Sequence, residues 1–202
     1  MNNLDNIVLL SGNSNVLLSE KISKNLNIKL CNRKIAKFSN TEIKINICEN
    51  IRNKDVFIVQ TGTNDINNSI NDYIMETLLL IDTCKRSMAN TINLIMPCYP
   101  YARQDKKENS REPISAKLFA NMLTTAGITR LIVIDLHASQ IQGFFDIPVD
   151  NLYAAPILVN DIKKNFTLKN TIITSPDVGG VVRARYIANK LDVNLAIVDK
   201  RR

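Results

Sequence analysis

Residues 92–135 decide the fold, and they read INLIMPCYPYARQDKKENSREPISAKLFANMLTTAGITRLIVID. The apolar runs 92–96 and 131–135 have strand length and little alternation, which is typical of parallel strands buried on both faces. Between them, Leu118 and Met122 are four residues apart and Gly127 is a stop signal, so we expect a helix over 115–126. Two strands joined by a helix form a βαβ unit, which predicts an α/β protein with a parallel sheet.

The same alternation extends along the rest of the chain. Apolar residues that share one face, Ile74 and Leu78 among them, predict a helix over 72–89. Residues 43–47 alternate strictly and predict a half-exposed strand. In an open parallel sheet, ligands bind at the carboxyl ends of the strands, so we expect the site in the loops that follow them. Further buried strands are expected at 7–10, 56–60, 172–174 and 195–198.

The chain also contains a candidate internal repeat. A shift of 165 residues lays residues 7–30 on residues 172–195 without a gap, and both stretches read as strand, polar turn, helix, link and strand. Because 45% of the residues are hydrophobic, some of the matching apolar positions could arise by chance. If the repeat is real, it predicts two similar domains, residues 1–150 and residues 151–202, of which the second is unfinished.

Composition restricts the class of protein and its partners. With 22% charged residues and 45% hydrophobic ones, the 202 residues are globular rather than disordered, fibrous or of low complexity. The net charge of +7 would suit a polyanion, but residues 183–202 hold six basic residues against two acidic ones, so the excess is local. Aromatic residues make up 5% and Trp is absent. We therefore expect no nucleic-acid partner that binds by base stacking.

The cysteines and the N-terminus indicate the compartment. The four cysteines are widely spaced with no CxxC pair, which favours reduced thiols in apolar positions over a zinc or disulfide site. We find no basic region followed by an apolar run at the N-terminus, and no stretch approaches 18 consecutive apolar residues. These features predict a soluble cytoplasmic protein that does not bind membranes.

Three segments carry residue types suited to phosphate chemistry. The loop 97–113 is rich in cations that could clamp phosphates, while its Gln104 offers amide hydrogen bonds; a solvated connection is the alternative. The single histidine, His137, follows a strand two residues after Asp135, so on an extended backbone the two side chains would share a face. With Asp146 and Asp150 they could hold Mg²⁺, although a lone histidine is more often structural.

The third segment, residues 174–180, ends a strand with Asp177 and a Gly179-Gly180 turn. That turn would allow a phosphate to approach the backbone closely and would place Asp177 at a metal or a ribose hydroxyl, but Gly-Gly is also common in tight turns. The chain ends with Lys200-Arg201-Arg202, which could be a cationic clamp or a charged tail.

Together these segments resemble the ribose-phosphate diphosphokinases, also called phosphoribosyl pyrophosphate synthetases, and most closely the eukaryotic-type branch. Essentially the whole chain falls inside the resemblance, and the run 135–150 is its most specific part. The matching segments are 38–42, 71–72, 101–107, 113–118, 135–150, 175–180 and 200–202.

The resemblance implies two phosphoribosyltransferase-type domains. It also implies a magnesium-dependent transfer of the diphosphoryl group of ATP to the 1-hydroxyl of ribose 5-phosphate, giving phosphoribosyl pyrophosphate and AMP. Family members form dimers that build hexamers and place part of the adenine site across a subunit boundary. The residue roles that it implies are adenine contacts for Phe38, Asn40 and Glu42, ATP contacts for Arg103 and Gln104, magnesium for Asp135 and His137, a second metal for Asp177, and stabilisation of the transferring group for Lys200 and Arg202.

One departure from the family pattern concerns the sugar site. Family members continue past this point to an Asp-Asp-x-x-Asp-Thr-x-Gly-Thr loop for ribose 5-phosphate, so we expect these 202 residues to be incomplete. The alternative function is a non-catalytic subunit that regulates true synthetases. Retention of Arg103, His137, Asp177 and Lys200 favours the enzyme. We expect the loop 101–111 and the turn 175–180 to converge on one cleft between two α/β units.

Overall fold

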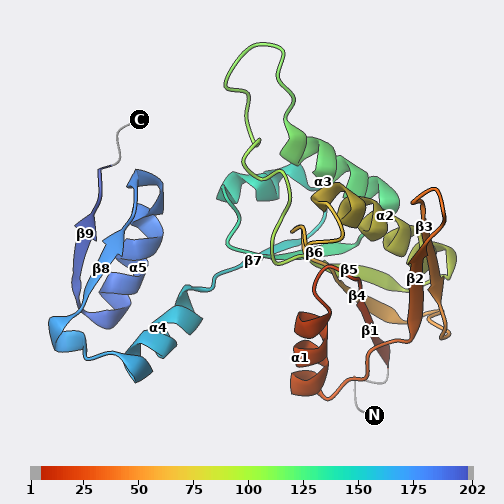
Figure 1. The fold of residues 1–202 in the computed structure, drawn as a ribbon, viewed down its shortest axis with the longest axis horizontal. Coiled ribbons are helices and arrows are strands. Elements are labelled where there is room, and N and C mark those ends of the chain that lie inside the picture. The colour runs from red at the N-terminus through yellow and green to blue at the C-terminus, as the bar shows by residue number, and fades with distance from the viewer. Residues whose placement is uncertain (1–5, 200–202) are drawn as a thin grey trace. The chain divides into compact units, whose positions relative to one another are not determined.

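The computed structural model describes residues 6–199, and the chain divides into two compact units, Met1–Leu152 and Tyr153–Arg202. The first unit is built on a five-stranded parallel sheet in the order β1-β4-β5-β6-β7 (Figure 1). The parallel α/β architecture expected from the apolar runs is therefore confirmed. The strands are β1 (Ile7–Ser11), β4 (Asp55–Val59), β5 (Thr91–Ile95), β6 (Arg130–Ile134) and β7 (Val149–Leu152).

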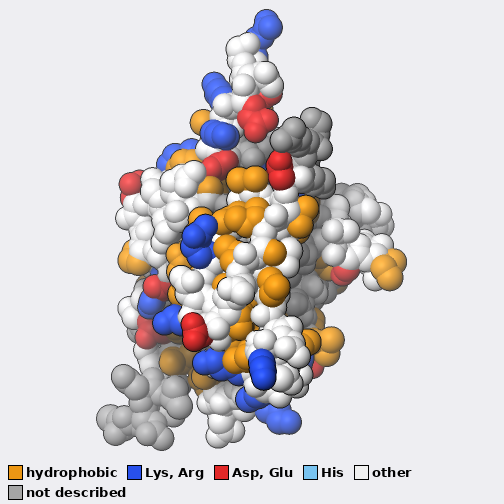
Figure 2. Space-filling view, turned by 90° about the vertical axis from the view of Figure 1, so that its left-hand side faces the viewer, with side chains coloured by type: hydrophobic (Ala, Val, Ile, Leu, Met, Phe, Trp, Pro, Cys, Tyr) orange, Lys and Arg blue, Asp and Glu red, His pale blue; other side chains and the backbone are white. Residues whose placement is uncertain are grey.

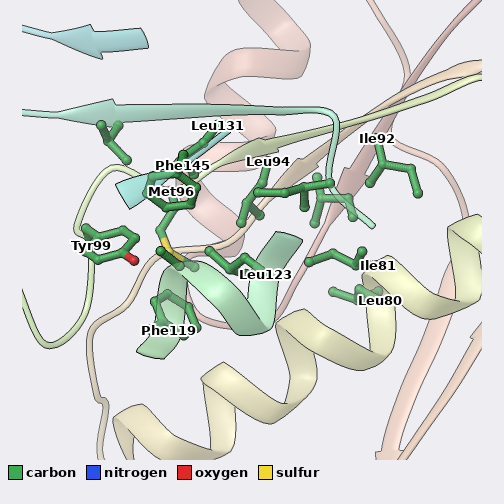
Figure 3. Packing of buried hydrophobic residues seen from close by; sticks show 14 of the residues in the cluster. Leu80, Ile81, Ile92, Leu94, Met96, Tyr99, Phe119, Leu123, Leu131 and Phe145 are labelled. Atoms are coloured by element: carbon green, nitrogen blue, oxygen red, sulfur yellow. The ribbon is translucent and has the colours of Figure 1, made fainter. Parts of the chain in front are cut away.

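Helices cover the two faces of this sheet unequally. Helices α2 (Ile70–Arg86) and α3 (Ser115–Ala126) lie on one face, and α1 (Val16–Leu26) lies on the other (Figure 1). Side chains that point to α2 and α3 are almost fully buried, and Figure 3 shows Leu94 and Leu131 packed towards Leu123. On the opposite face, Ile134 is 40% exposed. The expectation that every strand is buried on both faces is wrong, because α1 covers only the β1 side of the second face.

Local signals set the helix ends. Helix α3 has the bounds expected from its pattern, and it ends where Gly127 adopts a φ of 119°. Helix α2 begins two residues earlier than expected because Ser69 and Asp72 form a capping box. It ends earlier as well, at Arg86, because Met88 takes a left-handed φ of 58°.

An antiparallel hairpin stands beside the sheet. It joins β2 (Arg33–Lys37) to β3 (Ile43–Ile47), and Ile35 pairs with Ile45. The strict alternation of 43–47 correctly predicted β3, whose isoleucines are half-buried. Strand β2 was not predicted, because three of its five residues are basic and its pairing with β3 depends on the neighbouring strand.

The second unit contains a two-stranded parallel sheet, and its elements are α4 (Ala155–Asn165), β8 (Ile172–Ser175), α5 (Val181–Leu191) and β9 (Asn194–Ile197). Helix α5 begins and ends 165 residues after α1. The residues that end the two helices, Asn27 and Asp192, correspond under the same shift, and both adopt left-handed conformations with φ of 53° and 55°. Both units have the strand, turn and helix that the repeat predicts, but the strand expected at the end of the first copy is reduced to an isolated bridge between Leu30 and Leu9.

Candidate functional site

The first turn of α2 joins two segments at the carboxyl edge of the first unit. The Lys37 ammonium lies 3.1 Å from an Asp72 carboxylate oxygen and so ties the β2–β3 hairpin to the helix. The Tyr101 hydroxyl donates to Oδ1 of Asn71 at 2.7 Å and ties the loop after β5 to the same turn. The hairpin and the loop therefore share one anchor.

The loop after β5 has a fixed backbone and exposed side chains. The buried Tyr99 hydroxyl donates to the Ala116 carbonyl at 2.9 Å, and its ring centroid lies 5.2 Å from that of Phe119. The Gln104 carbonyl accepts the first backbone bond of α3, from the Ala116 N–H at 3.2 Å. Arg103 and Gln104 are themselves exposed. The loop thus presents a cation and an amide next to a backbone position that is hydrogen-bonded to the start of α3, and binding residues are often carried on loops held in this way.

A side-chain hydrogen bond brings the loops after β5 and β6 together. The Gln140 amide donates to Oδ2 of Asp105 at 3.2 Å, and Gln140 lies in the 3₁₀ helix Ser139–Phe144, which begins two residues after His137. His137 is exposed. The segment that carries Arg103 and Gln104 is therefore adjacent to the segment that carries His137.

The backbone at Asp135 differs from the expected geometry. Strand β6 ends at Ile134, and Asp135 has a left-handed φ of 49° while its N–H donates to the Leu152 carbonyl at 2.8 Å. The prediction that Asp135 and His137 share a face of an extended strand is wrong, because the chain turns at Asp135. Aspartate tolerates this conformation better than most residues.

The structure does not bring the four expected magnesium ligands into one group. Within residues 6–199, no group of three or more His, Cys, Asp or Glu side chains is placed to hold a metal ion. Asp150 pairs with Arg130 at 2.5 Å, and this bond raises the pKa of the Arg130 guanidinium. Asp150 lies beside Ile132 in the sheet, three residues before Asp135, or about 10 Å along the strand direction. The expectation that Asp135, His137, Asp146 and Asp150 together hold one Mg²⁺ ion is therefore corrected, because Asp150 is paired with Arg130 and lies away from Asp135.

The hairpin residues Phe38, Asn40 and Glu42 lie at the tip between β2 and β3. The Phe38 N–H donates to the Glu42 carbonyl at 2.8 Å, and Asn40 Oδ1 accepts from the Glu42 N–H at 3.3 Å. The Phe38 ring is 50% exposed, and the Lys44 ammonium lies 5.6 Å from its centroid. An exposed ring beside polar groups is suited to stacking on a planar ligand.

The third segment lies in the second unit. Its turn is closed by Asp177, whose Oδ1 accepts from the Gly180 N–H at 2.9 Å. A Cβ at Gly180 would lie 2.8 Å from Ser175 Oγ, so any larger residue there would have to displace that hydroxyl. Asp177 is exposed. Lys200 and Arg202, the expected catalytic cations, fall outside the described residues.

The sequence analysis missed a buried polar cluster after β1 and β4. Gln60 is fully buried and Glu76 is 4% exposed, and they are joined by a hydrogen bond of 2.9 Å from Gln60 Nε2 to Glu76 Oε1. A signal was present, because Glu76 stands in the apolar run of α2 where an amphipathic helix places core residues.

The sequence is similar to a family of known proteins. Residues 7–127 match the family model described as the N-terminal domain of ribose phosphate pyrophosphokinase. The ribose-phosphate pyrophosphokinase of Rhizobium meliloti is 54% identical over 95% of this chain and 61% of its own length. Ribose-phosphate pyrophosphokinase 4 of Saccharomyces cerevisiae is 50% identical over 98% of this chain and 60% of its own length.

A solved structure is similar as well. The crystal structure of phosphoribosylpyrophosphate synthetase from Mycobacterium smegmatis superposes with a TM-score of 0.90 at 39% identity, and the match covers 98% of this chain and 65% of that one. The chain thus spans about 61% of the length of the curated relatives. Among the described residues, no helix is both long and apolar enough to cross a membrane.

Proposed function

This chain belongs to the ribose-phosphate pyrophosphokinase family, and from that premise we propose that it forms the ATP-binding part of a ribose-phosphate diphosphokinase. The complete enzyme would transfer the diphosphoryl group of ATP to the 1-hydroxyl of ribose 5-phosphate, releasing AMP. The observation that carries the proposal is the bond between Gln140 and Asp105, which puts the exposed Arg103 loop beside the His137 segment. This reaction needs charge neutralisation and in-line positioning, and both can come from rigid cationic loops.

The five exposed residues of the first unit that we assign to ATP have distinct parts in this proposal. Arg103 would form charge-assisted hydrogen bonds to ATP phosphates, and Gln104 would add neutral ones. Phe38 would stack on adenine, while Asn40 and Glu42 would contact its polar edge. Because Phe38 lies on a hairpin held to α2 by the Lys37–Asp72 pair, its ring is presented by a supported element.

Asp135 and His137, without Asp146 and Asp150, are still suited to a Mg²⁺ ion that also binds the nucleotide phosphates. Mg²⁺ in nucleotide sites is usually held by one or two carboxylates together with the substrate phosphates, so a cage of three protein ligands is not required. Asp135 and His137 would lie beside it, and when bound it would neutralise phosphate charge. Asp177 would serve a second metal, and Lys200 with Arg202 would stabilise the transferring group.

We further propose that the protein works as a homo-oligomer, of dimers that build hexamers, in the cytoplasm. An adenine site shared between subunits would explain why the adenine residues stand on a projecting hairpin whose aromatic ring is half exposed. The four cysteines are free, as a reducing compartment allows, although only Cys31 and Cys84 are buried as expected.

Binding of ATP in the presence of Mg²⁺ tests the site. We expect Arg103→Ala and His137→Ala each to weaken binding roughly tenfold to more than a hundredfold, since loss of a charge-assisted contact costs about 1.5 to 3 kcal/mol. Isothermal titration calorimetry measures the affinities. Arg86→Ala is the matched control, because Arg86 is an exposed arginine that pairs with Asp82 on α2. Unchanged affinity in both test variants would refute the assignment.

A further inference from the structure

The turn between β1 and α1 is closed from within by two buried side chains. Glu76 Oε1 accepts from the Asn13 N–H at 2.7 Å, and its Oε2 accepts from the Asn13 amide at 3.1 Å. Gln60 Oε1 accepts from the Ser14 N–H at 3.0 Å and from the Ser14 hydroxyl at 2.7 Å. Successive backbone donors of this turn therefore point at oxygen atoms supplied by α2 and by the end of β4.

This arrangement is that of an occupied oxyanion site. Successive N–H groups just before the first turn of a helix attract anions, because the helix dipole adds to their partial positive charge. Helix α1 has no acidic residue of its own in its first turn. A buried carboxylate is costly unless it is hydrogen-bonded, and the three donors that satisfy Glu76 come from Asn13 and Gln60. The Glu76 carboxylate therefore lies where an external anion would bind.

The corresponding turn of the second unit has a different acceptor. The shift of 165 residues lays Gly12 on Asp177 and Asn15 on Gly180. There the Gly180 N–H is bound by Asp177, a residue of the turn itself, and that residue is exposed. One turn of the repeat is closed by buried groups from other elements, and the other is closed by a surface carboxylate.

Gly12 makes the closure possible. A Cβ at this position would lie 2.1 Å from Gln60 Oε1, so any other residue would displace that side chain. In the second turn the corresponding residue, Asp177, carries a side chain. The two copies thus differ at the residue that decides whether a neighbouring side chain can enter the turn.

We propose that Glu76, supported by Gln60, is the resident anion of the β1–α1 turn, so that this turn takes no external anion. The inference goes beyond the proposed reaction and does not depend on it. It assigns Glu76 the place of a small oxyanion, of carboxylate or phosphate type, in a site that the protein keeps filled.

Chemical rescue tests the proposal. Glu76→Ala removes a group of the size of acetate, so we expect a lower melting temperature in chloride and a concentration-dependent recovery in acetate at the same ionic strength. Glu76→Gln keeps the space filled with a neutral group, so we expect lower stability and no recovery. The parent chain and the control Asn93→Ala, which also loses a buried polar side chain, should not respond to acetate.

The site of recovery is checked by the amide resonances of Asn13 and Ser14, which should shift when acetate is added to Glu76→Ala. If that variant is unfolded in chloride, the readout becomes its refolding yield from urea, which acetate should raise and chloride should not. Equal responses to acetate in Glu76→Ala and Asn93→Ala, or no response in Glu76→Ala by either measurement, would overturn the proposal.

Discussion

Two buried thiols make the stability of the first unit depend on pH. Burial raises the pKa of Cys84 to about 12 and that of Cys31 to about 11, above the value of 9.0 for a free thiol. Both side chains belong to the main hydrophobic cluster, and Cys84 is 0% exposed. In the native state these thiols therefore stay protonated at pH values at which an unfolded chain has lost its thiol protons.

The sign of the effect follows from this difference. Because the folded pKa values are raised, the contribution is fully present below about pH 9 and is lost as the pH rises towards 11 and 12. At pH 10 this difference should lower the free energy of unfolding by on the order of 1 kcal/mol per thiol, because one pKa unit corresponds to about that much. Urea unfolding at pH 8 and pH 10 measures the loss. We expect a smaller loss in Cys84→Ala and the parental loss in Cys98→Ser, whose thiol is exposed. The same loss in all three proteins would contradict this account.

A buried tyrosine gives a second residue-scale prediction. Tyr99 lies against Phe119 and Phe145, and its hydroxyl donates to the carbonyl of Ala116 in α3. Tyr99→Phe keeps the packing but leaves that carbonyl without this donor, which should cost about 1 to 3 kcal/mol. Thermal unfolding measures the cost. Tyr153→Phe is the control, because this tyrosine is 62% exposed and its hydroxyl should not affect stability. An equally small effect of Tyr99→Phe would show that the Tyr99 hydrogen bond does not stabilise the fold.

At the scale of elements, the N-terminus of α2 combines a helix cap with an ion pair. The Ser69 hydroxyl and the Asp72 carboxylate satisfy each other's backbone N–H groups, and Asp72 also pairs with Lys37. The Ser69 hydroxyl also donates to Asp72 Oδ2 at 2.6 Å, and this bond is the main reason that the pKa of Asp72 is lowered to about 2. The cap serves the helix, whereas the pair connects the helix to the hairpin.

Ser69→Ala and Lys37→Ala separate these two roles. Loss of an N-cap serine costs about 0.5 to 2 kcal/mol, whereas an exposed ion pair contributes about 0 to 1 kcal/mol. We therefore expect Ser69→Ala to lower the urea midpoint more than Lys37→Ala does. A larger loss in Lys37→Ala would mean that attachment of the hairpin matters more to stability than the cap.

The elements also show what a sequence can and cannot predict. Strands β4, β5 and β6 and helix α3 were predicted because their own residues carry the apolar pattern and the stop signal. Strand β2 was missed because its pairing depends on β3, and the turn at Asp135 was missed because one φ angle of an aspartate leaves no pattern. The loops that carry Arg103 and His137 were predicted as site segments, but the hydrogen bond that joins them forms between residues 35 apart.

At the scale of the whole chain, the two units differ in the size of their cores. The core of the first unit includes Leu10, Ile58, Leu80, Leu94 and Leu131 together with many further buried residues. Among the described residues, the second cluster has four buried members, which are Ala155, Val159, Ile187 and Leu191. Hydrophobic side chains also gather on the face drawn in Figure 2, and the second unit exposes Ile157, Phe166, Ile172 and Val182.

This difference predicts how amide hydrogen exchange is distributed along the chain. The free energy of local opening falls where few apolar contacts hold an element, so strands of a two-stranded sheet on a small core should open before strands in the middle of a five-stranded sheet. We expect exchange in β8, β9 and α5 to be at least tenfold faster than in β4 and β5, a difference of about 1.4 kcal/mol in opening free energy. Mass spectrometry of peptides from the exchanged chain measures both regions in one sample.

Two core variants serve as controls for each other. Ile187→Ala should accelerate exchange throughout the second unit and leave β4 and β5 unchanged. Leu94→Ala should accelerate exchange in the first unit and leave β8 and β9 unchanged. If β8 and β9 proved as protected as β5, the size of the hydrophobic core would not explain the distribution of exchange, and this prediction would be refuted.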